Sequence, residues 1–258
     1  MSILHYLFVF LAALSAGIIN ALAGGGTLIT FPTLLALGLA PISANMTNTI
    51  ALCPGFLGGT MAQVNDLSGQ KKRLWMVIPA AILGGLSGAT LLLQTTEKLF
   101  SNLVPFMILL ASVLLAVQTP LRNWLTRRQE HRASRSILEA WLVLPVFLGG
   151  IYGGYFGAGL SVILLAVLGL ILNDTLTRLN ALKQSIAFSA NLAAALLFIF
   201  SGKVVWSVAV VMMVGALIGG SLGGRLAGKV KPATLRWIVV TIGFVVGVIY
   251  LVRTFFTV

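Results

Sequence analysis

Acidic residues, histidine and cysteine are scarce in this chain of 258 residues, which has five Asp and Glu, two His and one Cys. The single Cys53 excludes an intramolecular disulfide and any metal or cluster site built from several cysteines. The five acids all fall in connections or at the edges of apolar segments: Asp66, Glu97, Glu130, Glu139 and Asp174. A carboxylate proton relay or cation site at membrane depth is therefore not indicated.

The same scarcity argues against an enzyme. An intramembrane hydrolase or metalloenzyme needs a Ser/His, His/Glu or paired-Asp set at membrane depth, and the sequence offers none. We therefore expect neither catalytic activity nor a bound cofactor or metal.

Charged residues of either sign are rare, at 9% of the chain, whereas 59% of the residues are hydrophobic. An average soluble domain is about 25% charged, so the composition predicts an integral protein of the lipid bilayer. The net charge of +12 comes from 17 Lys and Arg. They gather in connections, as in cytoplasmic loops of membrane proteins, and do not indicate a nucleic-acid partner.

Long apolar segments predict an all-α polytopic membrane protein with about eight segments. They fall at residues 3–40, 43–62, 74–93, 102–118, 139–172, 184–200, 204–222 and 237–257. A basic connection at 119–138 separates a first transmembrane repeat, 1–118, from a second, 139–258. Ala21-Leu22-Ala23 resembles a signal-peptidase site, but no basic region precedes it, so we expect the first segment to be retained.

Two glycine-rich breaks interrupt apolar segments at matching places in the two halves. The first lies within 17–28 and the second, 133 positions later, within 150–161. Glycine costs about 1 kcal/mol against alanine in a helix interior, so both segments are expected to break there. Paired interruptions of this kind are typical of the binding site of a secondary transporter.

The length of segment 139–172 favours a re-entrant turn. Its 34 residues would span roughly 50 Å as one helix, against a hydrocarbon core of about 30 Å. The basic connections at 63–73, 119–138 and 223–236 share the cytoplasmic side only if this segment returns to the side it entered from. The same reasoning applied to 3–40 places both termini outside and predicts an inverted repeat. One tilted, kinked span is the alternative.

The breaks supply the first candidate site residues. A half-helix that starts after a break presents free backbone N–H groups and the positive end of its dipole, which suits an anion. A plain kink is the alternative. The candidate substrate-binding residues are Gly24, Gly25, Gly26, Thr27, Gly157, Gly159 and Ser161.

Polar residues at the start of the following segments supply the rest, because polar groups in apolar helices usually face the protein interior. They are Asn45, Asn48, Thr49, Asn180, Lys183, Gln184 and Asn191. Lys183 could neutralise an anion. Helix capping by Asn and Thr and snorkelling of Lys183 to the interface are the alternatives. Other glycines, including Gly84, Gly88 and Gly219, are interpreted as helix-packing positions.

Around these residues the chain resembles the TauE/SafE family of membrane permeases. The resemblance rests on Gly24 to Gly26 followed by an apolar stretch with Pro32, and on a second motif from Gly154 to Gly159 after the basic connection. The second motif departs from the pattern, with Ala158 in place of glycine and Leu165 where Pro32 has its match. The resemblance implies a secondary permease that moves sulfite, sulfoacetate or related organosulfonates across the inner membrane.

The expected function is thus alternating-access transport of a small anion by a multi-pass protein whose basic 119–138 loop is cytoplasmic. A proton or sodium ion is a candidate coupling ion, and a homo-oligomer is a candidate assembly. A permease for an uncharged or cationic metabolite remains an alternative. So does a non-transporting anchor or regulatory subunit that docks a partner through 119–138.

Overall fold

The computed structural model describes residues 2–22, 24–130, 139–226 and 232–256. These residues form helices and connections and contain no strand. The α-helices are α1 Ile3–Leu22, α2 Thr27–Ala36, α3 Pro41–Ala62, α4 Lys71–Gln94, α5 Glu97–Glu130, α6 Val143–Tyr155, α7 Leu160–Ile171, α8 Leu176–Ile199, α9 Trp206–Leu226 and α10 Pro232–Phe256. Two 3-10 turns, η1 Val64–Leu67 and η2 Glu139–Leu142, precede α4 and α6.

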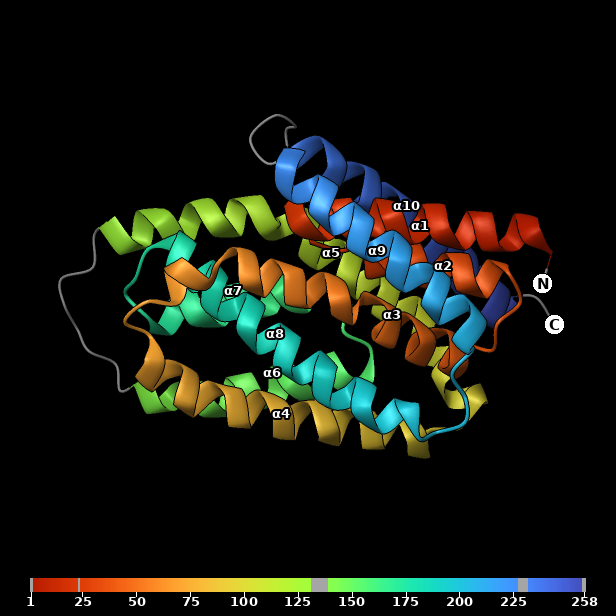
Figure 1. The fold of residues 1–258 in the computed structure, drawn as a ribbon, viewed down its shortest axis with the longest axis horizontal. Coiled ribbons are helices and arrows are strands. Elements are labelled where there is room, and N and C mark those ends of the chain that lie inside the picture. Colours follow the sequence, from red (N-terminus) through yellow and green to blue (C-terminus); the bar gives the residue numbers. More distant parts are fainter. Residues whose placement is uncertain (1, 23, 131–138, 227–231, 257–258) are drawn as a thin grey trace.

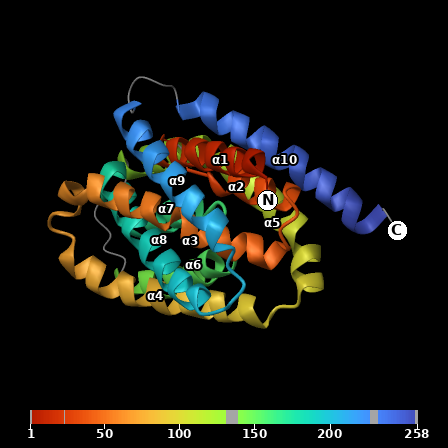
Figure 2. The same ribbon diagram turned by 45° about the vertical axis from the view of Figure 1, so that its right-hand side comes forward.

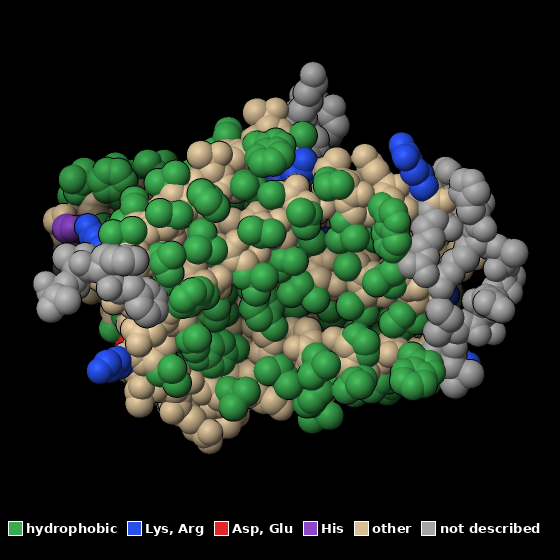
Figure 3. Space-filling view, turned by 180° about the vertical axis from the view of Figure 1, so that it is seen from behind, with side chains coloured by type: hydrophobic (Ala, Val, Ile, Leu, Met, Phe, Trp, Pro, Cys, Tyr) green, Lys and Arg blue, Asp and Glu red, His purple; other side chains and the backbone are tan. Residues whose placement is uncertain are grey.

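Six of these helices are long and apolar enough to cross a membrane: α1, α4, α5, α8, α9 and α10. Large apolar side chains cover much of the outer surface, as Figure 3 shows for one face, while Lys and Arg lie toward its rim. An exposed apolar belt on this scale requires a lipid surround rather than water. The expectation of an all-α polytopic membrane protein is confirmed.

Both interrupted segments are pairs of helices separated at the glycines. Segment 3–40 is α1 and α2, and segment 139–172 is η2 followed by α6 and α7. α7 returns to the end from which α6 starts, because Gly149 and Gly153 of α6 lie against Leu164 and Leu160. Each break therefore ends one helix and starts another.

Two helices extend beyond the apolar segments that predicted them. α5 continues to Glu130, so residues 119–130, expected as part of a loop, are helical. Polar residues end the apolar run there, but Leu121 and Leu125 keep one face apolar and pack on the core. α8 starts at Leu176 instead of 184. His131, Arg132 and Arg135 of the expected loop, and Lys229 and Lys231 of the 223–236 connection, lie outside the described residues.

The helices run roughly along one axis, and charge differs between its two ends. The start of α1 and the end of α10 lie at the same end, on the right in Figure 1, with the α8–α9 connection that carries Lys203. The opposite end holds the starts of α4 and α8 and the end of α5. That end, here called the basic end, carries Lys71, Lys72, Arg73, Arg122, Arg127 and Arg178.

α3 and α8 occupy the centre of the molecule and lie side by side (Figures 1 and 2). Of the six long apolar helices α8 is the most enclosed, with 61% of its apolar window buried. α3 packs against α1, α2, α5, α8 and α9. Helices enclosed on all sides can carry polar residues only where protein groups or a cavity receive them.

Several glycines permit close helix packing, as interpreted from the sequence. A Cβ at Gly84 or Gly88 of α4 would collide with backbone oxygens of α6, and one at Gly219 of α9 would collide with the oxygen of Leu14 in α1. Gly220 differs, since a Cβ there would meet nothing within 4 Å. Small residues at such crossings let helices approach closely in lipid.

An ion-pair network ties α4 to both ends of the α6–α7 hairpin. Arg73 donates to Glu139 in η2 and to Asp174, which follows α7, at 2.8 and 2.5 Å. Arg178 also pairs with Asp174, at 2.9 Å. Burial alone would raise the pKa of Asp174, but hydrogen bonds from Arg73 and Arg178 outweigh it and hold that pKa below its usual range.

Candidate functional site

The two glycine breaks meet at one small cavity in the centre of the molecule. Its volume is about 20 Å³, which is close to the space that one water needs. The lining residues are Asn20, Gly25, Thr27, Phe56, Leu115, Gly157, Gly159, Leu160, Ser161, Val162, Ala187 and Asn191. A Cβ at Gly24 would lie 3.8 Å from Ser161 Cβ, so residues from opposite halves of the chain face each other here.

Glycine is needed at both breaks because the backbone enters a left-handed conformation. Gly24 and Gly25 have φ of +80° and +93°, and Gly157 and Gly159 both have φ of +77°. A residue with a Cβ loses about 1–2 kcal/mol in that region. The repeated glycine pattern in the sequence therefore encodes two sharp chain reversals.

Each break has backbone amides without an acceptor among the described residues, which at the first break are those of Gly25 and Thr27. At the first break, the Gly26 N–H donates to Asn20 Oδ1 over 2.8 Å, so a side chain caps the start of α2. At the second, the amides of Gly159 and Ser161 have no acceptor among the described residues. Both residues line the cavity. The start of α7 thus presents uncapped N–H groups and a positive dipole end to the cavity.

Asn45 and Asn191 support the second break from neighbouring helices. Asn45 Nδ2 donates to the Tyr155 carbonyl at the end of α6 over 2.8 Å. Asn191 lines the cavity, and its Oδ1 lies 3.7 Å from the place of a Cβ on Gly157. Its Nδ2 donates to the Ala187 carbonyl. Asn45 therefore holds the break in place, and Asn191 borders the cavity itself.

The alternative that the Asn and Thr residues are helix caps does not hold. The residues that cap α3 and α8 are Ala40 and Thr175. Asn45, Asn48 and Asn180 lie at least one turn inside their helices and are buried or half-buried. Asn48 keeps a buried Oδ1 with no hydrogen bond among the described residues, and Thr49 donates to the Asn45 carbonyl.

A second polar group lies closer to the basic end. Lys183 is only 8% exposed, so it does not snorkel, and its Nζ donates to Asn180 Oδ1 over 2.7 Å. Asn180 donates in turn to Oε1 of Gln63, the residue that follows α3, over 2.7 Å. Gln184 packs on Gly59 of α3. None of these residues lines the central cavity.

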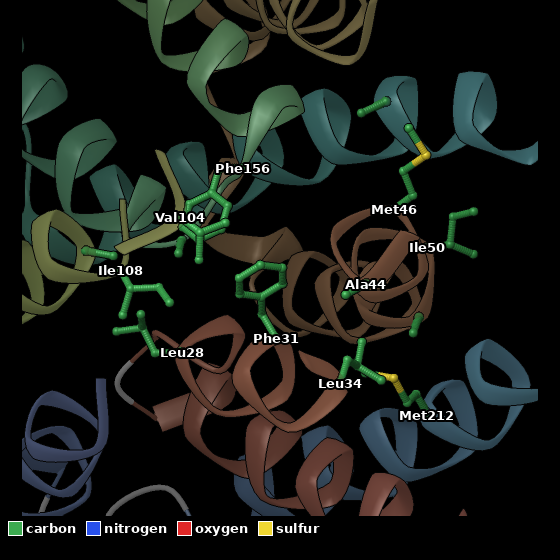
Figure 4. Packing of buried hydrophobic residues seen from close by; sticks show 14 of the residues in the cluster. Leu28, Phe31, Leu34, Ala44, Met46, Ile50, Val104, Ile108, Phe156 and Met212 are labelled. Carbon is green, nitrogen blue, oxygen red and sulfur yellow. The ribbon is translucent and has the colours of Figure 1, made fainter. Parts of the chain in front are cut away.

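On the side of the chain termini, aromatic residues pack beside the second break. Phe31 of α2 meets Phe156 edge to face, with ring centroids 5.2 Å apart (Figure 4). Phe100 of α5 contacts both Tyr155 and Phe156, at 5.7 and 6.5 Å. Phe31, Phe100 and Phe156 are buried. Buried aromatic side chains therefore pack together beside the cavity on the side of the chain termini.

The structure divides the sequence-predicted site residues into sets. The cavity brings together Gly25, Thr27, Gly157, Gly159, Ser161 and Asn191, with Gly24 and Gly26 in the same turn. Asn45 supports the second break from α3, whereas Asn48 and Thr49 lie on α3 outside the cavity lining, and Asn180, Lys183 and Gln184 form the separate group. Sequence reasoning missed Asn20, Phe56 and Gln63. Asn20 could have been identified from the sequence as a polar residue within an apolar segment, six positions before Gly26.

Comparisons with known proteins agree with this architecture. The profile of the family described as "Sulfite exporter TauE/SafE" matches residues 9–250. A "Probable membrane transporter protein" of Haemophilus influenzae is 29% identical over 81% of this chain and 79% of its own length. The "Probable membrane transporter protein YfcA" of Escherichia coli K12 is 27% identical, over 80% and 74% respectively. No solved structure matches the chain.

The family profile covers nearly all of the chain, including both breaks and the helices around the cavity. The relatives match over most of their own length as well. We conclude that this polytopic membrane protein is a membrane transporter and belongs to the TauE/SafE sulfite exporter family.

Proposed function

We propose that the chain is a secondary transporter of small anions that binds its substrate in the central cavity. The observation that carries this proposal is that both glycine breaks line one cavity and that the amides of Gly159 and Ser161 lack acceptors among the described residues. Uncapped N–H groups at a helix start favour negatively charged oxygens.

The groups around the cavity suit an oxyanion. The Thr27 and Ser161 hydroxyls and the amides of Gly159 and Ser161 can donate to oxygens, and none of the described residues that line the cavity carries a carboxylate. The family description names sulfite, and we extend the proposal to sulfoacetate and related organosulfonates, which present the same kind of oxyanion group. Asn191 completes the shell, and Asn45 keeps the second break in position.

The cavity measures only about 20 Å³, and we propose that the tips of the two hairpins separate when the substrate enters. We assign the structure to a closed state of an alternating-access cycle. The contact between Phe31 and Phe156 seals the side of the termini. Opening toward that side requires those rings to part.

In this proposal the two halves are inverted repeats whose breaks meet near the middle of the bilayer. Six Lys and Arg residues described at the basic end support a cytoplasmic location for that end in our proposal, and we propose that the protein lies in the inner membrane. The family's transport role favours this function over a non-transporting anchor.

The proposal is tested by uptake of 35S-labelled sulfite and sulfoacetate into proteoliposomes. Ser161→Val and Asn191→Leu should each lower uptake at least about 10-fold, equivalent to about 1.4 kcal/mol, because they replace polar cavity atoms with methyl groups. Ser189→Ala is the matched control: Ser189 is half-buried on α8 and does not line the cavity. It should leave uptake unchanged.

Two results would contradict the proposal. Uptake no faster than in protein-free vesicles, combined with transport of an uncharged or cationic solute, would exclude anion transport. Unchanged uptake by correctly folded Ser161→Val and Asn191→Leu variants would exclude the cavity as the binding site. Imposed proton and sodium gradients in the same assay identify the coupling ion.

A further inference from the structure

Lys183 holds a buried charge that its surroundings do not balance. The side chain is 8% exposed, and no carboxylate of the described residues lies within ion-pair distance of it. An ammonium has three N–H donors, and Asn180 Oδ1 is the one acceptor that Lys183 meets among the described residues. Burying an ammonium costs several kcal/mol unless a partner compensates it.

Lys183 lies on the same face of α8 as two residues that line the central cavity. Lys183, Ala187 and Asn191 are four residues apart along α8 and therefore share one face. Ala187 and Asn191 line the cavity. At 1.5 Å per residue, Lys183 lies about 12 Å along the helix from Asn191, toward the basic end.

α3 runs antiparallel beside this face of α8. Phe56 of α3 lines the cavity with Ala187 and Asn191, Gly59 lies against the Gln184 amide, and Gln63 bonds Asn180. The two helices thus carry polar groups at successive levels from the cavity to the basic end.

Two cationic side chains lie further in the same direction. Arg122 of α5 and Arg178 of α8 belong to the basic end, where Arg178 pairs with Asp174. The Gln184 amide, which lies against Gly59, adds a neutral donor one residue after Lys183, while the Gln63 amide nitrogen donates to the Gly59 carbonyl. An anion that leaves the cavity along α8 therefore meets a donor-rich group before it reaches water.

We propose that Gln63, Asn180, Lys183 and Gln184 form a second anion site, separate from the central cavity, which loads or releases the transported anion at the basic end. The bound anion supplies the negative countercharge that the Lys183 ammonium does not receive from the described residues. The proposal rests on the proposed function, because it takes the same class of oxyanion as cargo.

The second anion site is tested by measuring how many anions bind to each chain. Purified protein in detergent is dialysed to equilibrium against saturating 35S-labelled sulfoacetate. We expect two anions per chain for the wild type, one for Lys183→Met, one for Ser161→Val and none for the double variant. Lys72→Met, an exposed lysine of α4 at the same end, is the control and should bind two.

Sided transport provides the second readout. In membrane vesicles that expose the basic end, Lys183→Met should raise the KM for sulfoacetate at least 10-fold. From the opposite side its KM should stay within twofold of wild type. Lys183→Arg keeps the charge and should restore most of the affinity at the basic end. If Lys183→Met does not fold, as judged by gel filtration, Asn180→Leu and Gln63→Leu carry the test with the same expectation.

The outcomes separate this proposal from the proposed function. Two anions bound by a folded Lys183→Met variant, or an equal rise of KM on both sides, would overturn the second site. In either case loss of binding in Ser161→Val would leave the central site standing. A wild type that neither binds nor moves sulfoacetate or sulfite would overturn the proposed function itself.

Discussion

Individual polar side chains at the two breaks have different tasks. Asn20 satisfies the Gly26 amide, which the start of α2 would otherwise leave without a partner. Ser161 and Asn191, like Asn20, border the cavity. Asn20 therefore satisfies one amide of the first break, while both breaks keep other amide donors without an acceptor among the described residues.

Asp174 makes the stability of the basic end depend on pH. Its pKa is held below the usual range by Arg73 and Arg178, so it binds protons less readily in the folded state than in the unfolded one. Its contribution to stability is complete above the ordinary Asp pKa of about 3.9. That contribution is lost as the pH falls through the lower pKa of the folded state.

We expect Asp174→Asn to lower the melting temperature at pH 7, by several degrees, and the difference from wild type to shrink as the pH approaches 3. Melting in detergent across pH 3–7 measures this. Asp66→Asn serves as the control, since Asp66 lies at the same end but forms no ion pair with another described residue. A difference from wild type that is independent of pH would contradict the role of Asp174.

Pairs of helices owe their close approach to glycines where they face each other. In α9, Gly219 and Gly220 are neighbours in sequence, yet a Cβ would collide with α1 at Gly219 and meet nothing within 4 Å at Gly220. The pair therefore separates the effect of helix propensity from the effect of packing.

Gly219→Ala should destabilise the protein, by about 1–3 kcal/mol, because the new methyl group would overlap the Leu14 carbonyl. Gly220→Ala should be neutral or stabilising by up to about 1 kcal/mol, because alanine is the better helix former and the site is open. Thermal unfolding in detergent compares the two. Equal effects would show that α1 and α9 do not pack as described.

Much of the helical layout could be predicted from the sequence because apolar runs and glycine triplets report directly on lipid contact and chain reversal. The extent of α5 could not, since hydropathy detects a span but not an amphipathic extension such as the one that packs Leu125 on the core. The separation of Lys183 from the cavity depends on how α3 and α8 align. That alignment comes from contacts between distant segments, such as Gln63 with Asn180.

The complete fold predicts which ends face which compartment. Ser68, before α4, is exposed at the basic end, and Lys203, between α8 and α9, is exposed at the end of the termini. In a Cys53→Ala background, a membrane-impermeant maleimide should label Ser68→Cys in inverted vesicles and Lys203→Cys in right-side-out vesicles. Labelling of both from the same side would disprove the proposed orientation.

Arg73 joins Glu139 and Asp174, and with them the two feet of the α6–α7 hairpin, to a single point on α4. Because these ion pairs hold both ends of the hairpin at its base, we expect any movement of the hairpin to be smallest there and largest at its tip, which carries Gly157 and Gly159. A small tilt of the tip would widen the cavity without breaking the ion pairs at the basic end.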